Sequence, residues 1–188
     1  APQPLHVRVV RRGAHQVSQQ AAVGHPYQGG RHKAALALVM HVARQPGRGW
    51  KRLDPARTFA REGAVVVVTD AHGERALAVA REIERDSGVK TMGMACDVTR
   101  RKQVDEVIDA TLSRFGRIEI LFNNAGTNRP SPVTDISDEM WDLVLNTSLR
   151  GGFYCTRAVL PAMISQGYGR IVSVASVAAY MGLKAGHA

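Results

Sequence analysis

The chain has 188 residues, of which 45% are hydrophobic, so it is long enough for one well-buried domain and too short for two comfortable ones. Its formal charge of +9 would suggest a nucleic acid or an anionic membrane as a partner, but the charge is unevenly placed. Residues 1–53 hold nine Lys or Arg and no Asp or Glu, whereas the remainder has 16 basic and 16 acidic residues. This segment lacks a Cys/His finger spacing and a helical stripe of basic side chains, so we expect no nucleic-acid partner.

The chain has two cysteines, Cys96 and Cys155, without a C-x-x-C spacing or a companion His cluster. We interpret both as buried free thiols of a protein from a reducing compartment, with no metal or disulfide role. No apolar run is long enough to span a bilayer, and the start of the chain lacks the layout of a secretory signal. The expectation is a soluble, cytoplasmic protein without a membrane partner.

Residues 1–53 form a basic, atypical N-terminal segment, rich in Arg, Gln, His, Gly and Pro, with one possible strand at 34–42. Because the segment is basic and lacks acidic residues, it could be a transit-type leader, although Ser18 is its single serine. We favour another hypothesis, in which part of it is mistranslated or foreign sequence, such as a frameshift product upstream of Asp54. The domain proper is assigned to residues 54–188.

From Asp54 onward the sequence alternates between helical and strand patterns. Asp54 and Pro55 are typical of a helix start, and Gly63 is typical of a helix end. The continuous β-branched run that follows, 64–69, is typical of a parallel strand buried on both faces. The same patterns predict helices at 74–86, at 99–115 with Thr99 as its cap, and at 137–164, and strands at 90–96, 118–122 and 170–174. Strands separated by single helices imply right-handed crossovers, so the predicted fold is α/β with a Rossmann-like, doubly wound parallel sheet.

Asp70 comes directly after the predicted strand 64–69. In a dinucleotide-binding fold, a carboxylate at the end of the second strand accepts hydrogen bonds from the adenosine ribose, and its charge repels a 2'-phosphate. Asp70 therefore favours NAD as the cofactor, while the nearby Lys51, Arg52 or His72 could shift the preference toward NADP. The alternative is a solvated loop aspartate that caps the next helix.

Asn123 to Gly126 follow the strand 118–122 at its carboxyl end, where open α/β sheets bind their ligands. Small residues let a cofactor approach the backbone, and the asparagine amides can satisfy polar groups of the loop. Taken alone, this Asn-Asn-Ala-Gly run could equally be a simple turn.

Several of these features occur together and in a familiar order. Arg61 to Ala64 lead into a valine strand, and Asp97-Val98, Asn123 to Gly126, Asn146 and the run Gly169 to Ser176 follow. This combination resembles the classical short-chain dehydrogenase/reductase family over about Arg57 to Ala188. The resemblance implies an oxidoreductase that transfers a hydride between NAD(P) and a small alcohol or carbonyl substrate. It also implies that the full-length parent is a homo-oligomer.

The resemblance assigns roles to individual residues. Asp97 and Val98 would hold the adenine, and Asn124, Ala125 and Gly126 would line the adenosine side of the cofactor. As the catalytic residues, Ser176 would hydrogen-bond the substrate oxygen and Asn146 would hold a water in the proton relay. Without the resemblance, Ser176 is an ordinary strand-end serine and Asn146 an ordinary mid-helix polar residue.

Two parts of the sequence depart from the family pattern. Tyr180 and Lys184 have the Tyr-x-x-x-Lys spacing of the family's acid/base pair, but Tyr180 follows Ser176 too closely and Gly182 interrupts the segment. We interpret this pair as a coincidence and expect the catalytic tyrosine beyond Ala188, so that the chain is C-terminally truncated relative to the family.

 The expected consequence is an inactive chain, because losing a positioned acid/base typically costs about 10²- to 10⁴-fold in rate.

The second departure is the phosphate loop, which in the family follows the first strand. Here that region reads Pro46 to Arg52, with two glycines and Trp50 where a close approach needs no side chain. The run 34–42 still fits the central strand position, because the strands on either side need a partner there.

Two alternatives from other classes stay open. The chain could be a non-catalytic Rossmann module that binds a nucleotide, or a nucleic-acid-binding protein with a basic tail. NADH affinity without turnover in a version extended past Ala188 would favour the first, and a salt-dependent affinity that is lost without residues 1–53 would favour the second.

Overall fold

The computed structural model describes residues 6–10, 35–40 and 55–176. Within these residues, six parallel strands form one sheet in the order β1-β6-β5-β2-β3-β4. The strands are β1 (His6–Val10), β2 (Leu36–Met40), β3 (Val65–Asp70), β4 (Thr91–Ala95), β5 (Ile120–Asn123) and β6 (Arg170–Val174). The helices are α1 (Pro55–Arg61), α2 (Gly73–Ser87), α3 (Arg101–Phe115), the 3₁₀ turn η3 (Val133–Asp135), α4 (Asp138–Leu145), the π-helical turn η4 (Asn146–Arg150) and α5 (Gly151–Ser165).

The central strand is β2, which pairs with β3 on one side and β5 on the other. All five of its residues are buried, because a central strand of a parallel sheet is covered on both faces. Burying a side chain such as Leu38 stabilises the fold by roughly 1.5–3 kcal/mol. A strand thus lies within the run 34–42, at Leu36–Met40, in the central position of the sheet.

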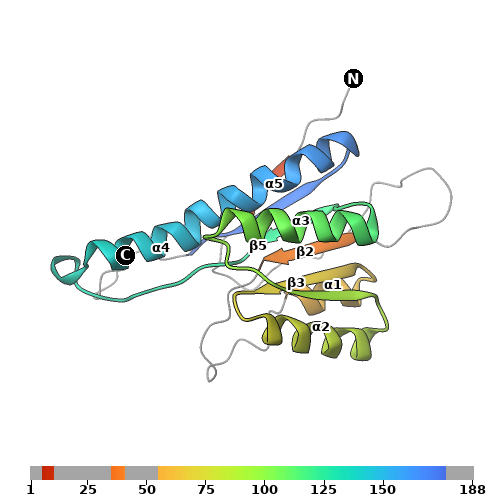
Figure 1. Cartoon of the computed structure of the whole chain (residues 1–188), viewed down its shortest axis with the longest axis horizontal. Helices are drawn as coiled ribbons and strands as arrows, with labels where there is room; N and C mark the ends of the chain where they lie inside the picture. The colour runs from red at the N-terminus through yellow and green to blue at the C-terminus, as the bar shows by residue number, and fades with distance from the viewer. Residues whose placement is uncertain (1–5, 11–34, 41–54, 177–188) are drawn as a thin grey trace.

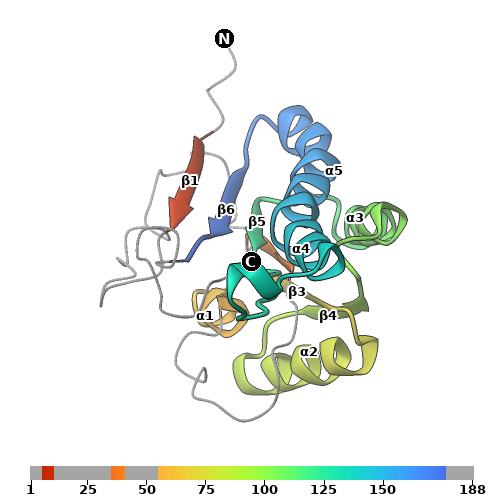
Figure 2. The same cartoon turned by 90° about the vertical axis from the view of Figure 1, so that its left-hand side faces the viewer.

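Helices cover both faces of the sheet, as Figure 2 shows, with α3 and α5 on one side and α1 and α2 on the other. Because successive strand residues point to opposite faces, Leu38 packs in the cluster with α3 and α5. Its neighbour Val39 packs in the cluster with α1 and α2. These two cores confirm the predicted doubly wound α/β fold.

Helices α2 and α3 end at the glycines that the sequence predicts. Gly88 and Gly116 have φ values of 72° and 77°, and their N–H groups donate to Glu84 and Leu112. The expected cap of α3 at Thr99 is wrong, since Arg100 occupies the cap position. Thr99 instead donates its hydroxyl to Asp97 Oδ1 at 2.7 Å, because the aspartate forms the tighter local turn.

Helices α4 and α5 form one long helix, which crosses the molecule in Figure 1. This matches the helix expected over 137–164, and Ser137 caps it by accepting a hydrogen bond from Met140 N. The sequence reasoning missed the π-helical turn η4 between the two parts. None of the described helices is long and apolar enough to cross a membrane.

Strand β1 lies in the basic N-terminal segment, where only 34–42 was expected to form a strand. It pairs in parallel with β6, with His6 opposite Arg170 and Val10 opposite Val174. An unpaired edge of β6 offers a row of backbone donors and acceptors, and the valine-rich β1 satisfies it. Two stretches of the N-terminal segment thus belong to the same sheet as the remainder of the chain.

Candidate functional site

The candidate site lies where the parallel strands end. Because all six strands run in the same direction, their carboxyl ends meet at one edge of the sheet. Asp70 is the last residue of β3, and Asn123 is the last residue of β5. The remaining predicted site residues at this edge are Asp97 and Val98 after β4, Asn124, Ala125 and Gly126 after β5, and Ser176 after β6.

Asp70 has a buried carboxylate that neighbouring residues of the same turn hold in place. Its Oδ1 accepts a hydrogen bond from the backbone N–H of His72 at 2.7 Å. The same oxygen lies 3.4 Å from His72 Nδ1 and 3.8 Å from Arg75 Nε. Its side chain is only 5% exposed, so it is not solvated, and its hydrogen bond to His72 N lies at the start of α2.

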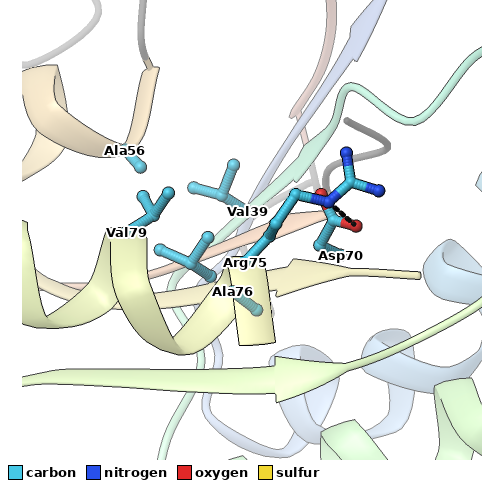
Figure 3. Close-up of a pocket in the computed structure, with 7 residues that line it drawn as sticks. Val39, Ala56, Asp70, Arg75, Ala76 and Val79 are labelled. Carbon is cyan, nitrogen blue, oxygen red and sulfur yellow. Dashed lines mark ion pairs between the residues drawn. The ribbon is translucent and has the colours of Figure 1, made fainter. Parts of the chain in front are cut away.

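A small cavity of about 60 Å³ adjoins this carboxylate on the face of the sheet covered by α1 and α2. Figure 3 shows the Asp70–Arg75 ion pair at one end of it. The cavity is lined by Val39, Ala56, Val68, Asp70, Arg75, Ala76 and Val79. Charged groups thus occupy one end of an otherwise apolar cavity.

Asp97 organises the turn between β4 and α3. Its Oδ1 accepts hydrogen bonds from Thr99 N at 3.0 Å and Thr99 Oγ1 at 2.7 Å, while Arg100 Nε lies 3.6 Å from Oδ2. The backbone N–H of Asp97 donates to Gln103 Oε1 at 2.7 Å. The side chain is 40% exposed, so it is rigidly held and still accessible.

Val98, the next residue, is fully buried against the long helix. A Cβ added to Gly151 would lie 2.6 Å from Val98 Cγ2, so only glycine permits this approach. Gly151 directly follows η4, and its N–H donates to the Asn146 carbonyl. The turn that carries Asp97 therefore packs directly on the helix that carries Asn146.

Asn123 joins three elements at the end of β5. Its Nδ2 donates to Thr156 Oγ1 in α5 at 3.2 Å and to Ser173 Oγ in β6 at 3.4 Å. Its Oδ1 is buried and has no hydrogen-bond partner among the described residues. The backbone N–H of Asn124 donates to Met40 O at 3.0 Å, which continues the pairing with β2. The Asn-Asn-Ala-Gly run is thus more than a simple turn, because its first two residues fasten the loop to the sheet.

Asn146 begins the π-helical turn η4 and is half-buried. Its N–H donates to the carbonyls of Asp142 and Leu143, and its carbonyl accepts from Gly151 five residues later. Such single π turns occur often at functional sites, because they change the direction of a side chain within a helix. Asn146 also borders a surface groove of about 290 Å³, together with Leu145, Leu149, Arg150 and Phe153.

Both cysteines are free and buried, as the sequence predicts. Burial is the main cause that raises the pKa of Cys96 and of Cys155 to about 12. Nearby negative charge adds to this effect, from Asp97 at Cys96 and from Cys96 at Cys155. In the part of the chain that the structure describes, no cluster of His, Cys, Asp and Glu could hold a metal ion.

Several residues discussed from the sequence lie outside the described residues. They are the altered phosphate loop from Pro46 to Arg52 and the pair Tyr180 and Lys184. Ser176 is the last described residue at the carboxyl edge, and its side chain is exposed.

Comparison with known proteins gives a consistent result. The sequence profile of the family described as short chain dehydrogenase matches residues 53–188. A 3-oxoacyl-(acyl-carrier-protein) reductase from Thermotoga maritima is 39% identical over 124 residues, which are 66% of this chain and 50% of that protein. The chain therefore spans about half the length of this curated relative.

Solved structures agree with the sequence matches. L-sorbose reductase from Gluconobacter frateurii, complexed with NADPH and L-sorbose, has a TM-score of 0.70 at 27% identity, covering 81% of this chain and 56% of that one. NAD+-bound xylitol dehydrogenase has a TM-score of 0.68 at 29% identity, covering 79% and 55%. The resemblance stated from the sequence is confirmed, and the chain belongs to the short-chain dehydrogenase family of oxidoreductases.

Proposed function

We propose that this chain binds NAD(P) at the carboxyl edge of its sheet and is part of an oxidoreductase that interconverts an alcohol and a ketone. The observation that carries the proposal is the placement of Asp70, Asp97 and Asn124 at one edge of a parallel sheet. Ligands of open α/β sheets bind outside the carboxyl ends of the strands. The activity is proposed for the whole protein, since the chain spans about half the length of its relatives.

The residues of the adenosine side suit a dinucleotide. All contacts of the Asp70 carboxylate among the described residues converge on Oδ1, which leaves Oδ2 for the ribose hydroxyls. Asp97 presents a rigidly held, accessible carboxylate that can accept from the adenine amino group. Ala125 and Gly126 carry little side chain, so a ligand can approach their backbone.

The reactive side would use Ser176 and Asn146. When bound, the nicotinamide supplies or accepts the hydride. The Ser176 hydroxyl would donate a hydrogen bond to the substrate oxygen and stabilise the charge that develops there. Asn146, at the π turn, would hold a water that passes protons to the site. The exposed position of Ser176 after β6 supports access to a substrate.

Two further proposals concern the location of the protein in the cell and its oligomeric state. Two free, buried thiols are typical of a reducing compartment, which supports a cytoplasmic location. Exposed apolar side chains follow the long helix at Trp141, Leu149 and Phe153, which supports a homo-oligomer of the whole protein. Light scattering of the purified protein measures its mass and tests the second proposal directly.

The cofactor proposal is tested by titrating the chain with NADH and following the nicotinamide fluorescence. We expect saturable binding, and we expect Asp70→Ala to weaken it about tenfold or more because hydrogen bonds to a charged group are lost. Asp86→Ala, which removes a more exposed carboxylate at the far end of α2, is the matched control and should leave the affinity unchanged. Absence of NADH binding by the folded chain would contradict the proposal.

A further inference from the structure

The two free thiols lie in one part of the core, although they are far apart in the sequence. Cys96 follows β4 and continues its pairing with β3, since its N–H donates to Asp70 O at 2.8 Å. Cys155 lies in α5. Both are fully buried in the cluster on the face of the sheet that α3 and α5 cover. The fold therefore brings two thiols from different elements to the same side of the sheet.

A close contact between the same two elements lies beside the thiols. Val98 follows Cys96 by two residues and belongs to the same cluster, and Gly151 lies one helical turn before Cys155 on the same face of α5. A Cβ added to Gly151 would lie 2.6 Å from Val98 Cγ2. Because α5 runs back across the sheet from its carboxyl edge, the steps from Gly151 to Cys155 and from Val98 to Cys96 both lead from that edge into the core. The contact thus places Cys96 and Cys155 on facing sides of one interface.

The electrostatics of the thiols agree with this placement. Burial is the main cause that raises the pKa of Cys155 to about 12, and the next is the charge of Cys96, which acts only over a short distance. Burial also raises the pKa of Cys96 to about 12, followed by the charges of Asp97 and Glu106. Both thiols are therefore protonated in the folded chain at neutral pH, and a protonated thiol is a poor nucleophile. Their oxidation requires that the interface opens first.

We infer that Cys96 and Cys155 form a redox-sensitive lock between the turn after β4 and the long helix. In the reduced protein the two thiols are packed in the core. When the contact between Val98 and Gly151 opens, a low-molecular-weight disulfide such as oxidised glutathione converts them into an intramolecular disulfide. The inference is independent of cofactor binding, and it assigns a role to two groups that the proposed function leaves unused.

The chemistry is two successive thiol–disulfide exchanges. One protein thiolate attacks a sulfur of oxidised glutathione, forms a mixed disulfide and releases one glutathione thiolate. The second protein thiolate attacks the protein sulfur of that mixed disulfide, forms the bond between Cys96 and Cys155, and releases the second glutathione. The protein loses two electrons and two protons, and oxidised glutathione gains them as two thiols.

The bond would stabilise the folded chain. It closes a loop from residue 96 to residue 155, which contains α3, β5 and α4. A cross-link that closes a long loop restricts the unfolded chain more than one that closes a short loop. It would also hold the turn of Asp97 and Val98 against the helix that carries Asn146. The oxidised chain should therefore resist urea better than the reduced chain.

The experiment incubates the purified chain with oxidised glutathione in urea below the unfolding midpoint, which populates the opened form. Mass spectrometry without reductant should then show a monomer lighter by two hydrogen atoms. Proteolytic digestion should give a peptide pair joined through Cys96 and Cys155. After glutathione and urea are removed, the urea midpoint of the oxidised chain should exceed that of the reduced chain by about 1 M or more.

Two single variants serve as controls. Cys96→Ala and Cys155→Ala, each shown to be folded by circular dichroism, should take up one glutathione and show no rise in midpoint after oxidation. Two separate glutathione adducts on the wild type, a disulfide-linked dimer, or thiols that stay free would overturn the inference. So would an intramolecular bond that lowers the urea midpoint, because that bond would not fit the folded geometry.

Discussion

Two buried carboxylates at opposite edges of the sheet have different surroundings. At the amino edge, Glu119 accepts a hydrogen bond from Leu36 N at 2.8 Å through Oε2, and its Oε1 forms an ion pair with Arg117. At the carboxyl edge, the carboxylate of Asp70 accepts from His72 N and forms its ion pairs with His72 and Arg75 through Oδ1. Both side chains are 5% exposed, so burial alone does not distinguish them.

The difference lies in how many of the oxygens are already bonded. Each oxygen of Glu119 has a partner in the fold, since Oε2 accepts from a strand N–H and Oε1 forms an ion pair with Arg117. The contacts of the Asp70 carboxylate lie at Oδ1, and Asn123 at the same edge has a buried Oδ1 without a hydrogen-bond partner among the described residues. A buried polar group that the fold does not satisfy is a candidate for binding, whereas a satisfied one is structural.

The largest expected effect is on stability at the amino edge. Glu119→Ala leaves Leu36 N and the partly exposed Arg117 without their partner, so we expect the free energy of unfolding to fall by about 3 kcal/mol. Glu119→Gln keeps an acceptor for Leu36 N and should cost less. Urea unfolding measures both, and a loss below about 1 kcal/mol in the alanine variant would contradict a structural role.

A smaller loss of stability is expected where the turn of Asp97 and Val98 packs against the long helix. Gly151→Ala places a Cβ 2.6 Å from Val98 Cγ2, which should cost about 2 kcal/mol through overpacking. The shift of the Asp97–Val98 turn should also weaken NADH binding. Gly152→Ala is the matched control, because its Cβ would have its nearest neighbour 4.0 Å away. Equal stability and equal NADH affinity of the two variants would argue against this packing.

At the carboxyl edge we expect a small effect on stability and a larger effect on cofactor binding. Asp70→Ala removes one hydrogen bond and a partly solvated ion pair, so the free energy of unfolding should fall by only about 1 kcal/mol. NADH affinity should nevertheless fall about tenfold or more, while Glu119→Gln should bind NADH normally once folded. A stability loss as large as that of Glu119→Ala would remove the contrast between the two edges.

The two thiols should make the free energy of unfolding depend on pH only in the alkaline range. Their pKa of about 12 in the folded chain lies above the ordinary value of 9.0, so folding favours the protonated form. This contribution to stability is fully present below pH 9 and decreases as the pH rises toward 12. A thiol-reactive dye at pH 8 should label Cys96 and Cys155 only after urea unfolding, and rapid labelling of the folded chain would contradict their burial.

Most of the fold from Asp54 onward was predictable from local patterns. Valine runs, helical periodicity and glycines at the helix ends each depend on a few neighbouring residues, so they are visible in the sequence. The π turn at Asn146 and the strand β1 were not predicted. The first depends on how Gly151 packs against Val98, and the second depends on an edge of β6 that is distant in sequence.

For the candidate site, the sequence identified which residues follow each strand, but not their hydrogen-bond partners. The family likeness and the order of the elements were determined by the sequence alone, since both depend on residues in a linear order. Only the tertiary structure decided that Arg75 lies beside Asp70, that Asn123 joins three elements, and that each oxygen of Glu119 has a partner. The reason is physical: the charge and hydrogen-bonding capacity of a side chain depend on neighbours that folding brings within a few ångströms.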